Sequence, residues 1–267
     1  MSKTCLIIGL GQIGMGYDYK LLNKSVIYTH AYAIEKHPKF ILIGGVDNSE
    51  EKKNLFEKRF KVPTFDNVEK ALKKLQPDLV VIATPTETHS SILTKIINLS
   101  KPRIILCEKP LSYKVEEAKN MINKCKEAGI DLFVNYIRSV DSGVLEIKRR
   151  IVNGKILTPL KVNVWYSKGI FNNGSHFLNL LEMWLGKVES VKILNNGGMW
   201  NNKDPEPDFE IKFNLGIAIF RAAWEEAFSH HSIELLSSSG RLFYDKGGEK
   251  IEFQSVSKDI NFKEYIK

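Results

Sequence analysis

The sequence predicts an α/β protein in which an N-terminal doubly wound parallel sheet precedes a C-terminal α+β domain with a mostly antiparallel open sheet. Two observations predict this order. Up to about residue 135, short apolar runs alternate with amphipathic helical patterns, as in βαβ units. Beyond it, apolar and polar residues alternate at the strand period. We therefore expect one domain over residues 1–120 and another over residues 121–267, with the boundary anywhere in 120–138; a chain of 267 residues accommodates two modest domains.

The first half contains short runs of apolar, often β-branched residues. Such runs are typical of strands buried on both faces of a parallel sheet. The predicted strands are Thr4–Leu10, Phe40–Val46, Leu79–Ala83, Arg103–Cys107 and Ile130–Val134.

Helical patterns lie between these runs. Asn48 with Glu51, and Asp66 with Glu69, have the spacing of a capping box at a helix start. A later helix closes at Gly129. We expect two of the helices to bury apolar faces, formed by Val68, Ala71, Leu72 and Leu75 in one and by Val115, Ala118, Ile122 and Cys125 in the other.

In the second half, a helix is predicted near Val144–Val152 and a short one over Gly174–Leu185. The stretch Asn195–Pro207 is rich in Asn, Gly, Asp and Pro, so we expect a loop there. Residues Ser237–Gly240 predict a hairpin turn. The predicted strands are Leu160–Tyr166, Val188–Leu194, Phe209–Phe213, Ile217–Trp224, Ser232–Leu236, Arg241–Tyr244 and Lys250–Phe253.

Composition excludes several classes of protein. Hydrophobic residues make up 43% and charged residues 26%, which are globular values. No apolar run approaches the ~18 residues that span a bilayer, so we expect no membrane partner. The first strand begins at once, which leaves no room for a signal peptide. The three cysteines lie in apolar stretches without a CxxC pair, which indicates reduced thiols in a cytoplasmic protein.

The net charge of +8 comes from 39 Lys and Arg against 31 Asp and Glu. Basic and acidic residues are mixed on the predicted helices, so solvated helix faces explain most of the charge. We expect no nucleic-acid partner, whereas a positive field favours an anionic small substrate such as a nucleotide-linked sugar. We also expect no metal site, because His230 and His231, on a predicted strand, have no Cys or acid at metal-ligand spacing.

A glycine-rich loop directly follows the first strand. Its sequence, Gly9-Leu10-Gly11-Gln12-Ile13-Gly14, matches GxGxxG, whose glycines allow a tight turn and let backbone amides approach a pyrophosphate. The second strand ends at Asp47, where a carboxylate can bind the ribose hydroxyls of NAD in preference to NADP. By itself the loop could be a packing turn, but its place between strand and helix favours dinucleotide binding.

The spacing between loop and acid is unusual. Asp47 lies 33 positions beyond Gly14, against ~20 in the common fingerprint. We assign the surplus to Met15–Thr29, where Gly16–Tyr19 is a poor helix start. We therefore expect a loop at the mouth of the cofactor site.

Two further segments follow predicted strands at the sheet edge where open α/β sheets bind ligands. They are Ala83-Thr84-Pro85-Thr86-Glu87-Thr88-His89 and Cys107-Glu108-Lys109-Pro110-Leu111-Ser112. Ordinary strand-to-helix turns also contain Pro, Ser and Thr, so the residues alone leave this alternative open.

The order of these motifs is similar to that of a known family. The glycine loop, the strand ending in Asp, the Ala-Thr-Pro-x-x-x-His turn, Glu-Lys-Pro, Asn135-x-x-Arg138 and a Gly-x-His helix start at Gly174 occur in sequence. This resembles the glucose–fructose oxidoreductase / inositol dehydrogenase / rhizopine catabolism (Gfo/Idh/MocA) family over nearly the whole chain. The segment Asn172–His176 is most similar to the branch found in bacterial surface-polysaccharide pathways.

The resemblance implies an NAD(P)-dependent oxidoreductase acting on CH–OH groups of sugars, cyclitols or sugar nucleotides, with a C-terminal substrate and oligomerisation domain and a homodimeric or homotetrameric assembly. It implies catalysis by Lys109 and His176. The other implied contacts are Gly9, Gly11, Gln12, Ile13, Gly14, Asp47, Thr84, Pro85, His89, Glu108 and Lys109 for the cofactor, and Lys109, Arg138, Tyr166, Asn172 and His176 for the substrate.

The residue types suit this chemistry. The ordinary pKa of histidine is ~6.5, so His176 could exchange the proton of a secondary alcohol at neutral pH. Burial and a cationic nicotinamide would push Lys109 toward its neutral form. The alternative for His176 is a helix-start histidine hydrogen-bonded to backbone.

One departure keeps other functions open. The usual Asp-x-Gly-x-His-x-x-Asp phrase has amides here, Asn172 and Asn179, which cannot accept a proton. This shifts proton transfer onto Lys109 and His176. Two alternatives remain: a double-bond or imine reductase similar to the biliverdin reductases, and a non-catalytic NAD-binding sensor or assembly protein.

Overall fold

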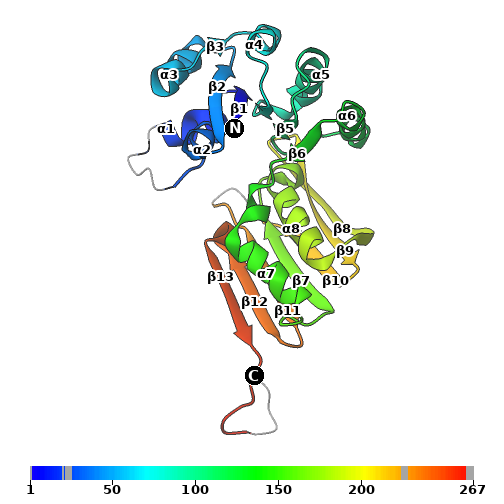
Figure 1. Ribbon diagram of the computed structural model, residues 1–267. Coiled ribbons are helices and arrows are strands. Elements are labelled where there is room, and N and C mark those ends of the chain that lie inside the picture. Colours follow the sequence, from blue (N-terminus) through cyan, green and yellow to red (C-terminus); the bar gives the residue numbers. More distant parts are fainter. Residues whose placement is uncertain (1, 20, 22–25, 224–227, 263–267) are drawn as a thin grey trace. The chain divides into compact units, whose positions relative to one another are not determined.

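The computed structural model describes residues 2–19, 21, 26–223 and 228–262 (Figure 1). The chain divides into two compact units, Met1–Asn135 and Tyr136–Lys267. This division lies in the interval 120–138 where the sequence places a domain boundary. Each unit has its own sheet and its own core.

Unit 1 contains a parallel sheet, as predicted. Among its described residues, the strand order across the sheet is β3-β2-β1-β4-β5-β6. Strands β2 and β3 are thus added on one side of β1, and β4, β5 and β6 on the other, so the order reverses between β1 and β4. Ile8 at the end of β1 pairs with Val46 on one side and Ile82 on the other, so three strands end in register. The strands are β1 (Lys3–Ile8), β2 (Phe40–Val46), β3 (Thr64–Phe65), β4 (Leu79–Ile82), β5 (Ile104–Cys107) and β6 (Asp131–Val134).

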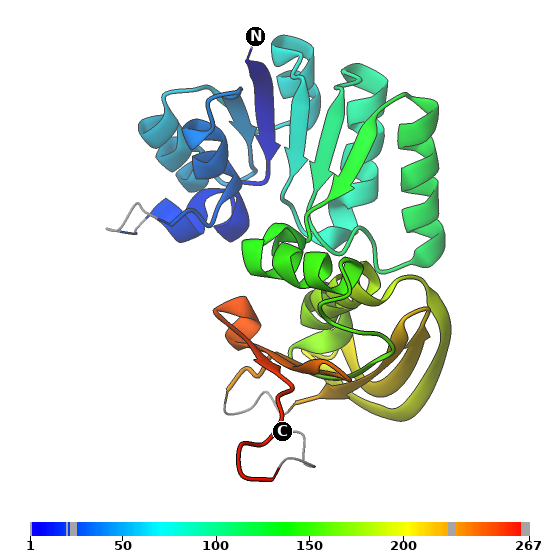
Figure 2. The ribbon, with the colours of Figure 1, turned by 60° about the horizontal axis from the view of Figure 1, so that its bottom comes forward.

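Helices cover both faces of this sheet (Figure 2). Successive residues of β1 point to opposite faces of the sheet, and both faces are apolar. Leu6 and Ile8 belong to the core beneath α4, α5 and α6. Cys5 and Ile7 belong to the core beneath α2 and α3. The helical elements are η1 (Gln12–Gly16), α1 (Tyr17–Tyr19), α2 (His30–Lys36), α3 (Glu50–Phe60), α4 (Val68–Leu75), η2 (Thr86–Thr88), α5 (His89–Leu99) and α6 (Val115–Glu127).

The predicted helix caps are wrong by one residue. Ser49, not Asn48, caps α3 by accepting a hydrogen bond from the amide of Lys52. Asn67, not Asp66, caps α4 in the same way. In both places two consecutive residues could act as a cap, and the sequence pattern does not decide between them.

The predicted buried face of α6 is only half right. Cys125 is buried and Ala118 packs against the core, but Val115 and Ile122 are 70% and 50% exposed. Met121 is buried in their place. The buried arc therefore follows the spacing 118–121–125 and leaves the two β-branched residues in solvent.

The segment after the glycine loop also differs from expectation. Gly16–Tyr19, predicted as loop, is helical. Asp18 is buried there and accepts hydrogen bonds from the amides of Tyr28 and Thr29 and from the Thr29 hydroxyl. Part of the predicted Met15–Thr29 loop, residues 20 and 22–25, lies outside the described residues.

Unit 2 contains a mostly antiparallel sheet, as predicted. Its described strands follow the order β13-β12-β11-β7-β10-β9-β8, with β7 and β10 pairing in parallel and the other neighbours antiparallel. The strands are β7 (Leu160–Tyr166), β8 (Val188–Trp200), β9 (Asp204–Phe213), β10 (Gly216–Ala222), β11 (Ser232–Ser237), β12 (Gly240–Asp245) and β13 (Lys250–Ser255).

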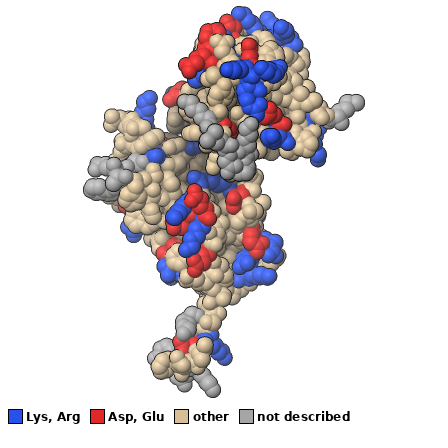
Figure 3. All heavy atoms as spheres, turned by 90° about the vertical axis from the view of Figure 1, so that its left-hand side faces the viewer, with Lys and Arg blue, Asp and Glu red and all other residues tan. Residues whose placement is uncertain are grey.

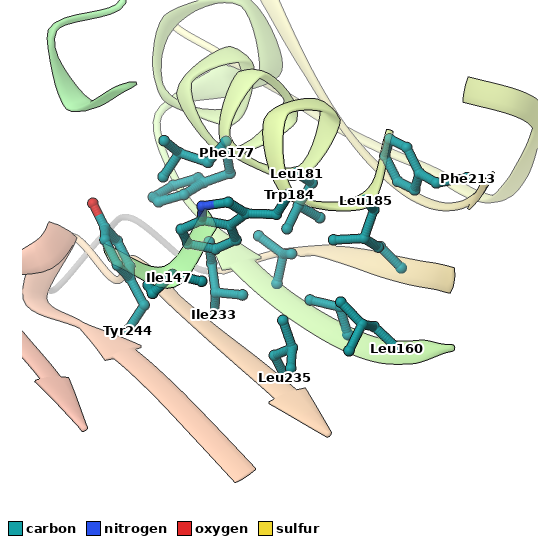
Figure 4. Close-up of a cluster of buried hydrophobic side chains, with 14 of the residues drawn as sticks. Ile147, Leu160, Phe177, Leu181, Trp184, Leu185, Phe213, Ile233, Leu235 and Tyr244 are labelled. Carbon is teal, nitrogen blue, oxygen red and sulfur yellow. The ribbon is translucent and has the colours of Figure 1, made fainter. Parts of the chain in front are cut away.

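The core of unit 2 lies between this sheet and two helices, α7 (Ser142–Val152) and α8 (Ser175–Leu185). Phe177, Leu181 and Trp184 on α8 pack toward β7, β11 and β12 (Figure 4). The indole of Trp184 donates to the carbonyl of Val144, so its buried polar atom is paired. Short helical turns complete the unit: η3 (Ile137–Val140), η4 (Gly169–Gly174) and η5 (Lys246–Gly248).

The predicted loop over Asn195–Pro207 is wrong, because most of it forms the long β8–β9 hairpin. The turn is only Asn201–Lys203, and Asn201 and Asn202 have positive φ angles of 50° and 56°, which asparagine tolerates better than most residues. Register shifts along β8 absorb the extra residues. Gly197 is required at one of them, since a Cβ there would lie 1.8 Å from the carbonyl oxygen of Glu206.

Two smaller expectations also change. The strand predicted to reach Trp224 ends at Ala222, and Trp224 lies outside the described residues. His230 and His231 precede β11 and are not part of it. The hairpin turn predicted at Ser237–Gly240 is confirmed, since these two residues pair across β11 and β12.

Charged side chains are intermixed on the surface (Figure 3). Many are ion-paired, such as Arg59 with Glu35 and Arg149 with Glu146. The solvated faces inferred from the sequence therefore account for much of the charge. None of the described helices combines the length and the apolar character needed to cross a membrane.

The three cysteines are buried and unlinked, as predicted. Burial raises the pKa of the Cys5 thiol to about 12 and also raises those of Cys107 and Cys125. All three therefore remain protonated thiols at neutral pH.

Candidate functional site

A cavity of about 860 Å³ lies in unit 1 where β1, β2 and β4 end. This is the point at which the strand order reverses, and it is the usual ligand-binding place in open parallel sheets. Three segments form much of its lining, namely the glycine loop, the turn after β2 and the turn after β4, and residues of α1, α4 and α5 add to it. The lining residues include Gly9, Gly11, Gln12, Ile13, Asp47, Asn48, Ser49, Lys52, Thr84, Pro85 and Thr88.

The glycines of the loop have different roles. A Cβ on Gly9, where φ is +99°, would lie 2.5 Å from the carbonyl oxygen of Ala83. A Cβ on Gly14 would lie 2.1 Å from the carbonyl oxygen of Gly9. A Cβ on Gly11 would meet nothing within 4 Å and would enter the cavity. Gly9 and Gly14 thus permit tight packing, whereas Gly11 leaves room for a ligand against the backbone.

Asp47 faces the same cavity and also supports the loop. Its Oδ2 accepts a hydrogen bond from the amide of Leu10 at 2.8 Å, and its Oδ1 accepts one from Ser49 at 2.9 Å. The ammonium of Lys52 lies 3.7 Å from Oδ2. The carboxylate is only 12% exposed, so it is held in one orientation at the edge of the cavity.

The turn after β4 supplies Thr84 and Pro85 to the cavity wall. The hydroxyl of Thr88 lies 2.7 Å from both the Thr84 hydroxyl and the Pro85 carbonyl, which makes the turn compact.

His89 is placed differently from the sequence expectation. Instead of lining the cavity it is fully buried, with Nε2 2.9 Å from the Thr84 carbonyl and Nδ1 3.2 Å from the Leu111 carbonyl. Its ring therefore connects the turn after β4 to the segment that follows Pro110.

The Glu-Lys-Pro segment follows β5, the neighbour of β4. The peptide bond between Lys109 and Pro110 is cis. The carboxylate of Glu108 is nearly sealed from solvent and contacts His30 and Asn135, each 2.7 Å from Oε1. Burial raises the pKa of Glu108, but the hydrogen bonds from His30 and Asn135 outweigh it, so the net pKa is lowered. Glu108 is therefore ionised at neutral pH.

Sequence reasoning missed His30 and Asn135 as partners of Glu108. His30 begins the short helix α2, and Asn135 directly follows β6 as the last residue of unit 1. Their contacts with Glu108 bridge 78 and 27 positions of sequence. The Asn-x-x-Arg match points to Asn135, whereas no pattern in the sequence distinguishes His30 from a surface histidine.

In unit 2, His176 lies in the first turn of α8 and is 8% exposed. The ring of Tyr136 meets its imidazole edge to face, with centroids 5.7 Å apart. Burial raises the pKa of Tyr136, against a smaller opposing effect of its hydrogen bond with Ser175. A neutral phenol therefore packs beside the imidazole.

A carboxylate that the sequence did not single out fixes the segment before His176. Asp204 is buried, and its two oxygens accept hydrogen bonds from the amides of Phe171 at 2.9 Å and Asn172 at 2.8 Å. Gly169, at φ +80°, leaves room for it, because a Cβ there would lie 2.0 Å from the Asp204 Cγ. Asp204 belongs to the hairpin that the sequence predicted as a loop.

Two predicted substrate residues make contacts within unit 2. Tyr166 is fully buried in the core of unit 2, where its hydroxyl donates to the carbonyl of Pro207. Burial raises its pKa far above the ordinary value, so Tyr166 is a core residue. Arg138 donates to the carbonyl of Gly247 in the η5 turn, and its guanidinium carbon lies 6.0 Å from the ring centroid of Phe177.

Among the residues that the structure describes, no three His, Cys, Asp or Glu side chains are grouped to hold a metal ion. His231 instead packs near Phe177, with ring centroids 5.9 Å apart.

Comparison with known proteins agrees with this geometry. A model of the GFO_IDH_MocA family, described as an oxidoreductase family with an NAD-binding Rossmann fold, matches residues 3–136. The chain is similar to scyllo-inositol 2-dehydrogenase (NAD+) of Bacillus subtilis, with 31% identity over 62% of this chain and 54% of that protein. It is also similar to myo-inositol 2-dehydrogenase of Thermotoga maritima, with 27% identity over 57% of this chain and 42% of that protein. The matches thus span about half the length of these curated relatives.

The fold extends the similarity over both units. The WlbA dehydrogenase of Bordetella pertussis, solved in complex with NADH and UDP-GlcNAcA, superposes with a TM-score of 0.79. The superposition covers 97% of this chain and 79% of that chain at 19% sequence identity. At this identity the similarity shows the fold alone.

Proposed function

This chain belongs to the Gfo/Idh/MocA family of oxidoreductases, and we propose that it transfers hydride between a nicotinamide cofactor and a hydroxyl or carbonyl group of a cyclitol, a sugar or a sugar nucleotide. The observation that carries the proposal is the cavity at the ends of β1, β2 and β4, with Gly11 open toward it and Asp47 at its edge. This combination suits a dinucleotide.

The residues fit NAD at each point of the cavity. The loop amides would hold the pyrophosphate, and Asp47 would accept hydrogen bonds from the adenine ribose hydroxyls. A carboxylate repels the 2′-phosphate of NADP, so we propose a preference for NAD. Thr84 and Pro85 would line the path of the cofactor toward the Glu-Lys-Pro segment. When bound, the cofactor supplies the hydride acceptor or donor.

We propose that Lys109 and His176 carry out the proton transfer that accompanies hydride transfer. Lys109 directly follows the ionised Glu108 and would hydrogen-bond the reacting oxygen of the substrate. His176 would accept the proton in oxidation and return it in reduction. Asn172 and Asn179 can orient a hydroxyl but cannot exchange a proton, so the histidine and the lysine share that task.

The substrate class rests on the relatives and on charge. Two relatives are named as inositol dehydrogenases, and the WlbA structure holds a uronic-acid sugar nucleotide. The net charge of +8 favours anionic substrates. We propose cyclitols and nucleotide-linked sugars as the two substrate classes to test first. We also propose that the protein is cytoplasmic and self-associates as a homodimer or homotetramer.

The first experiment is a fluorescence titration of the purified protein with NADH and, separately, with NADPH. We expect micromolar binding with NADH preferred. Inositols, sugars and nucleotide-linked sugars are then screened with NAD or NADH by following the absorbance of the reduced cofactor. Turnover on a member of these classes supports the proposal.

Other outcomes separate the alternatives. NADH binding without turnover on any sugar, unrestored by Asn172→Asp, favours a non-catalytic NAD-binding protein. Reduction of a tetrapyrrole pigment favours the biliverdin-reductase type of chemistry. Failure to bind either cofactor contradicts the proposal altogether.

A further inference from the structure

His30 makes a contact that none of the family motifs includes. Its Nε2 lies 2.7 Å from Oε1 of Glu108, although the two residues are 78 positions apart. The side chains are 11% and 12% exposed, so water competes little for this contact. Asn135 donates to the same oxygen from 2.7 Å.

Glu108 is connected directly to Lys109. Its second oxygen, Oε2, accepts a hydrogen bond from the Lys109 amide at 3.3 Å, and the two residues share a peptide bond. A nearly sealed carboxylate must keep its donors or move toward solvent. Loss of the His30 donor would therefore shift Glu108 and, with it, the backbone from which the Lys109 side chain projects.

The position of His30 is itself fixed by the segment that follows the glycine loop. The buried carboxylate of Asp18 binds the amides of Tyr28 and Thr29 and the Thr29 hydroxyl, the last at 2.6 Å. Helix α2 then begins at His30 and packs into the unit 1 core through Ala31 and Ile34. The extra residues between the glycine loop and Asp47 thus lead into the start of α2, which the hydrogen bonds of Asp18 hold in place. From this position the imidazole of His30 contacts Glu108.

We infer that His30 is a positioning residue, whose imidazole holds the Glu108 carboxylate and thereby sets the direction in which Lys109 faces the substrate. This inference rests on the proposed function for the role of Lys109. It assigns a purpose to the described part of the long segment between Gly14 and Asp47, which contacts the Glu-Lys-Pro segment through His30.

Three variants test the inference. His30→Ala removes the donor, His30→Gln retains an N–H donor on a side chain of similar length, and His37→Ala removes an exposed histidine just beyond the other end of α2. The readouts are kcat and KM on the substrate found in the screen, the Kd for NADH, and the acetylation of Lys109 by acetic anhydride relative to exposed Lys73, measured by mass spectrometry.

For His30→Ala we expect kcat to fall roughly 10- to 100-fold, as for a misplaced catalytic group, while the Kd for NADH changes less than about threefold. The labelling ratio of Lys109 should change by more than about twofold, since its orientation changes. His30→Gln should recover most of kcat and the wild-type labelling ratio. His37→Ala should match the wild type in all readouts.

Two results would overturn the inference. One is a kcat for His30→Ala equal to that of His37→Ala. The other is a loss of NADH binding that His30→Gln does not repair, which indicates general damage to unit 1. If the wild type turns over no sugar, the proposed function fails, and the labelling ratio still decides: an unchanged ratio in His30→Ala contradicts the positioning role.

Discussion

Asp47 accepts a hydrogen bond from the amide of Leu10, with Oδ2 2.8 Å from the nitrogen, so the acid at the end of β2 holds the glycine loop in place. The other oxygen accepts the amide of Ser49, the cap of α3. One carboxylate therefore joins the loop and the start of α3 and also borders the cavity. Substitution of Asp47 should affect both the ligand and the loop.

For Asp47→Asn we expect a roughly tenfold higher Kd for NADH and a smaller preference over NADPH, because an amide has a single good acceptor and no charge. The free energy of unfolding should fall by about 1 kcal/mol. Parallel NADH and NADPH titrations and urea denaturation measure these effects. Asp131→Asn, at an exposed position on β6, is the control for loss of one charge. An unchanged NADH-to-NADPH ratio contradicts the ribose-binding role.

The different surroundings of Gly9 and Gly11 predict opposite phenotypes for the same substitution. Gly11→Ala should leave the stability unchanged, because its Cβ meets nothing within 4 Å and its φ of −73° suits alanine. It should weaken NADH binding at least about tenfold, since the methyl group enters the pyrophosphate position. Gly9→Ala should destabilise unit 1 by roughly 2–4 kcal/mol, because φ is +99° and the Cβ approaches the Ala83 carbonyl.

Far-UV circular dichroism with urea, together with NADH titration, separates the two effects. Tryptophan fluorescence does not report on this unit, because all four tryptophans lie between residues 165 and 224. Equal stabilities for Gly9→Ala and Gly11→Ala would contradict the assigned roles of the two glycines.

The proton-transfer roles predict a separation of binding from turnover. Lys109→Met and His176→Ala should each lower kcat about 10²- to 10⁴-fold, the usual range for loss of a general acid or base. The Kd for NADH should change less than about threefold, since neither residue lines the cavity in unit 1. Steady-state kinetics and NADH titration measure both quantities, with Lys119→Met on the exposed face of α6 as control. Turnover retained in both variants removes these residues from the mechanism.

The sequence predicts the elements whose signal is local. The strand over Leu160–Tyr166 is predicted to the residue, because Leu160, Val162 and Val164 face the core while Lys161 and Asn163 face solvent. Five of the parallel strands of unit 1 are also predicted, because each contains a run of apolar residues. The two-residue strand β3 is not predicted, since Thr64–Phe65 is too short to give a pattern. The glycine loop is a local motif that follows β1, and Asp47 follows β2. Because neighbouring parallel strands end at the same edge of the sheet, the placement of both at one cavity could also be predicted.

The features that the sequence does not predict depend on partners far along the chain. The β8–β9 hairpin contains Asn, Gly and Pro, which are unfavourable in strands, and cross-strand pairing overrides that preference. His30 and Asp204 gain their roles only from Glu108 and from the turn before α8, 78 and more than 30 positions away. Likewise, Tyr166 alternates correctly as a strand residue, but only the packed core shows that its hydroxyl is buried.

Asp204 gives the last prediction, because one buried carboxylate organises the segment that leads into the helix of His176. In Asp204→Ala the partly buried amides of Phe171 and Asn172 lose their acceptor, which should cost roughly 2–4 kcal/mol. Asp204→Asn keeps one acceptor and should cost about half as much. Urea denaturation followed by tryptophan fluorescence suits this test, since Trp184 lies in the core of unit 2. Lys203→Ala, in the exposed turn of the same hairpin, is the matched control. If Asp204→Ala is as stable as Lys203→Ala, the carboxylate does not hold the segment. If Asp204→Ala is less stable while its Kd for NADH equals that of the wild type, the damage is confined to unit 2. Any loss of turnover is then due to the placement of His176.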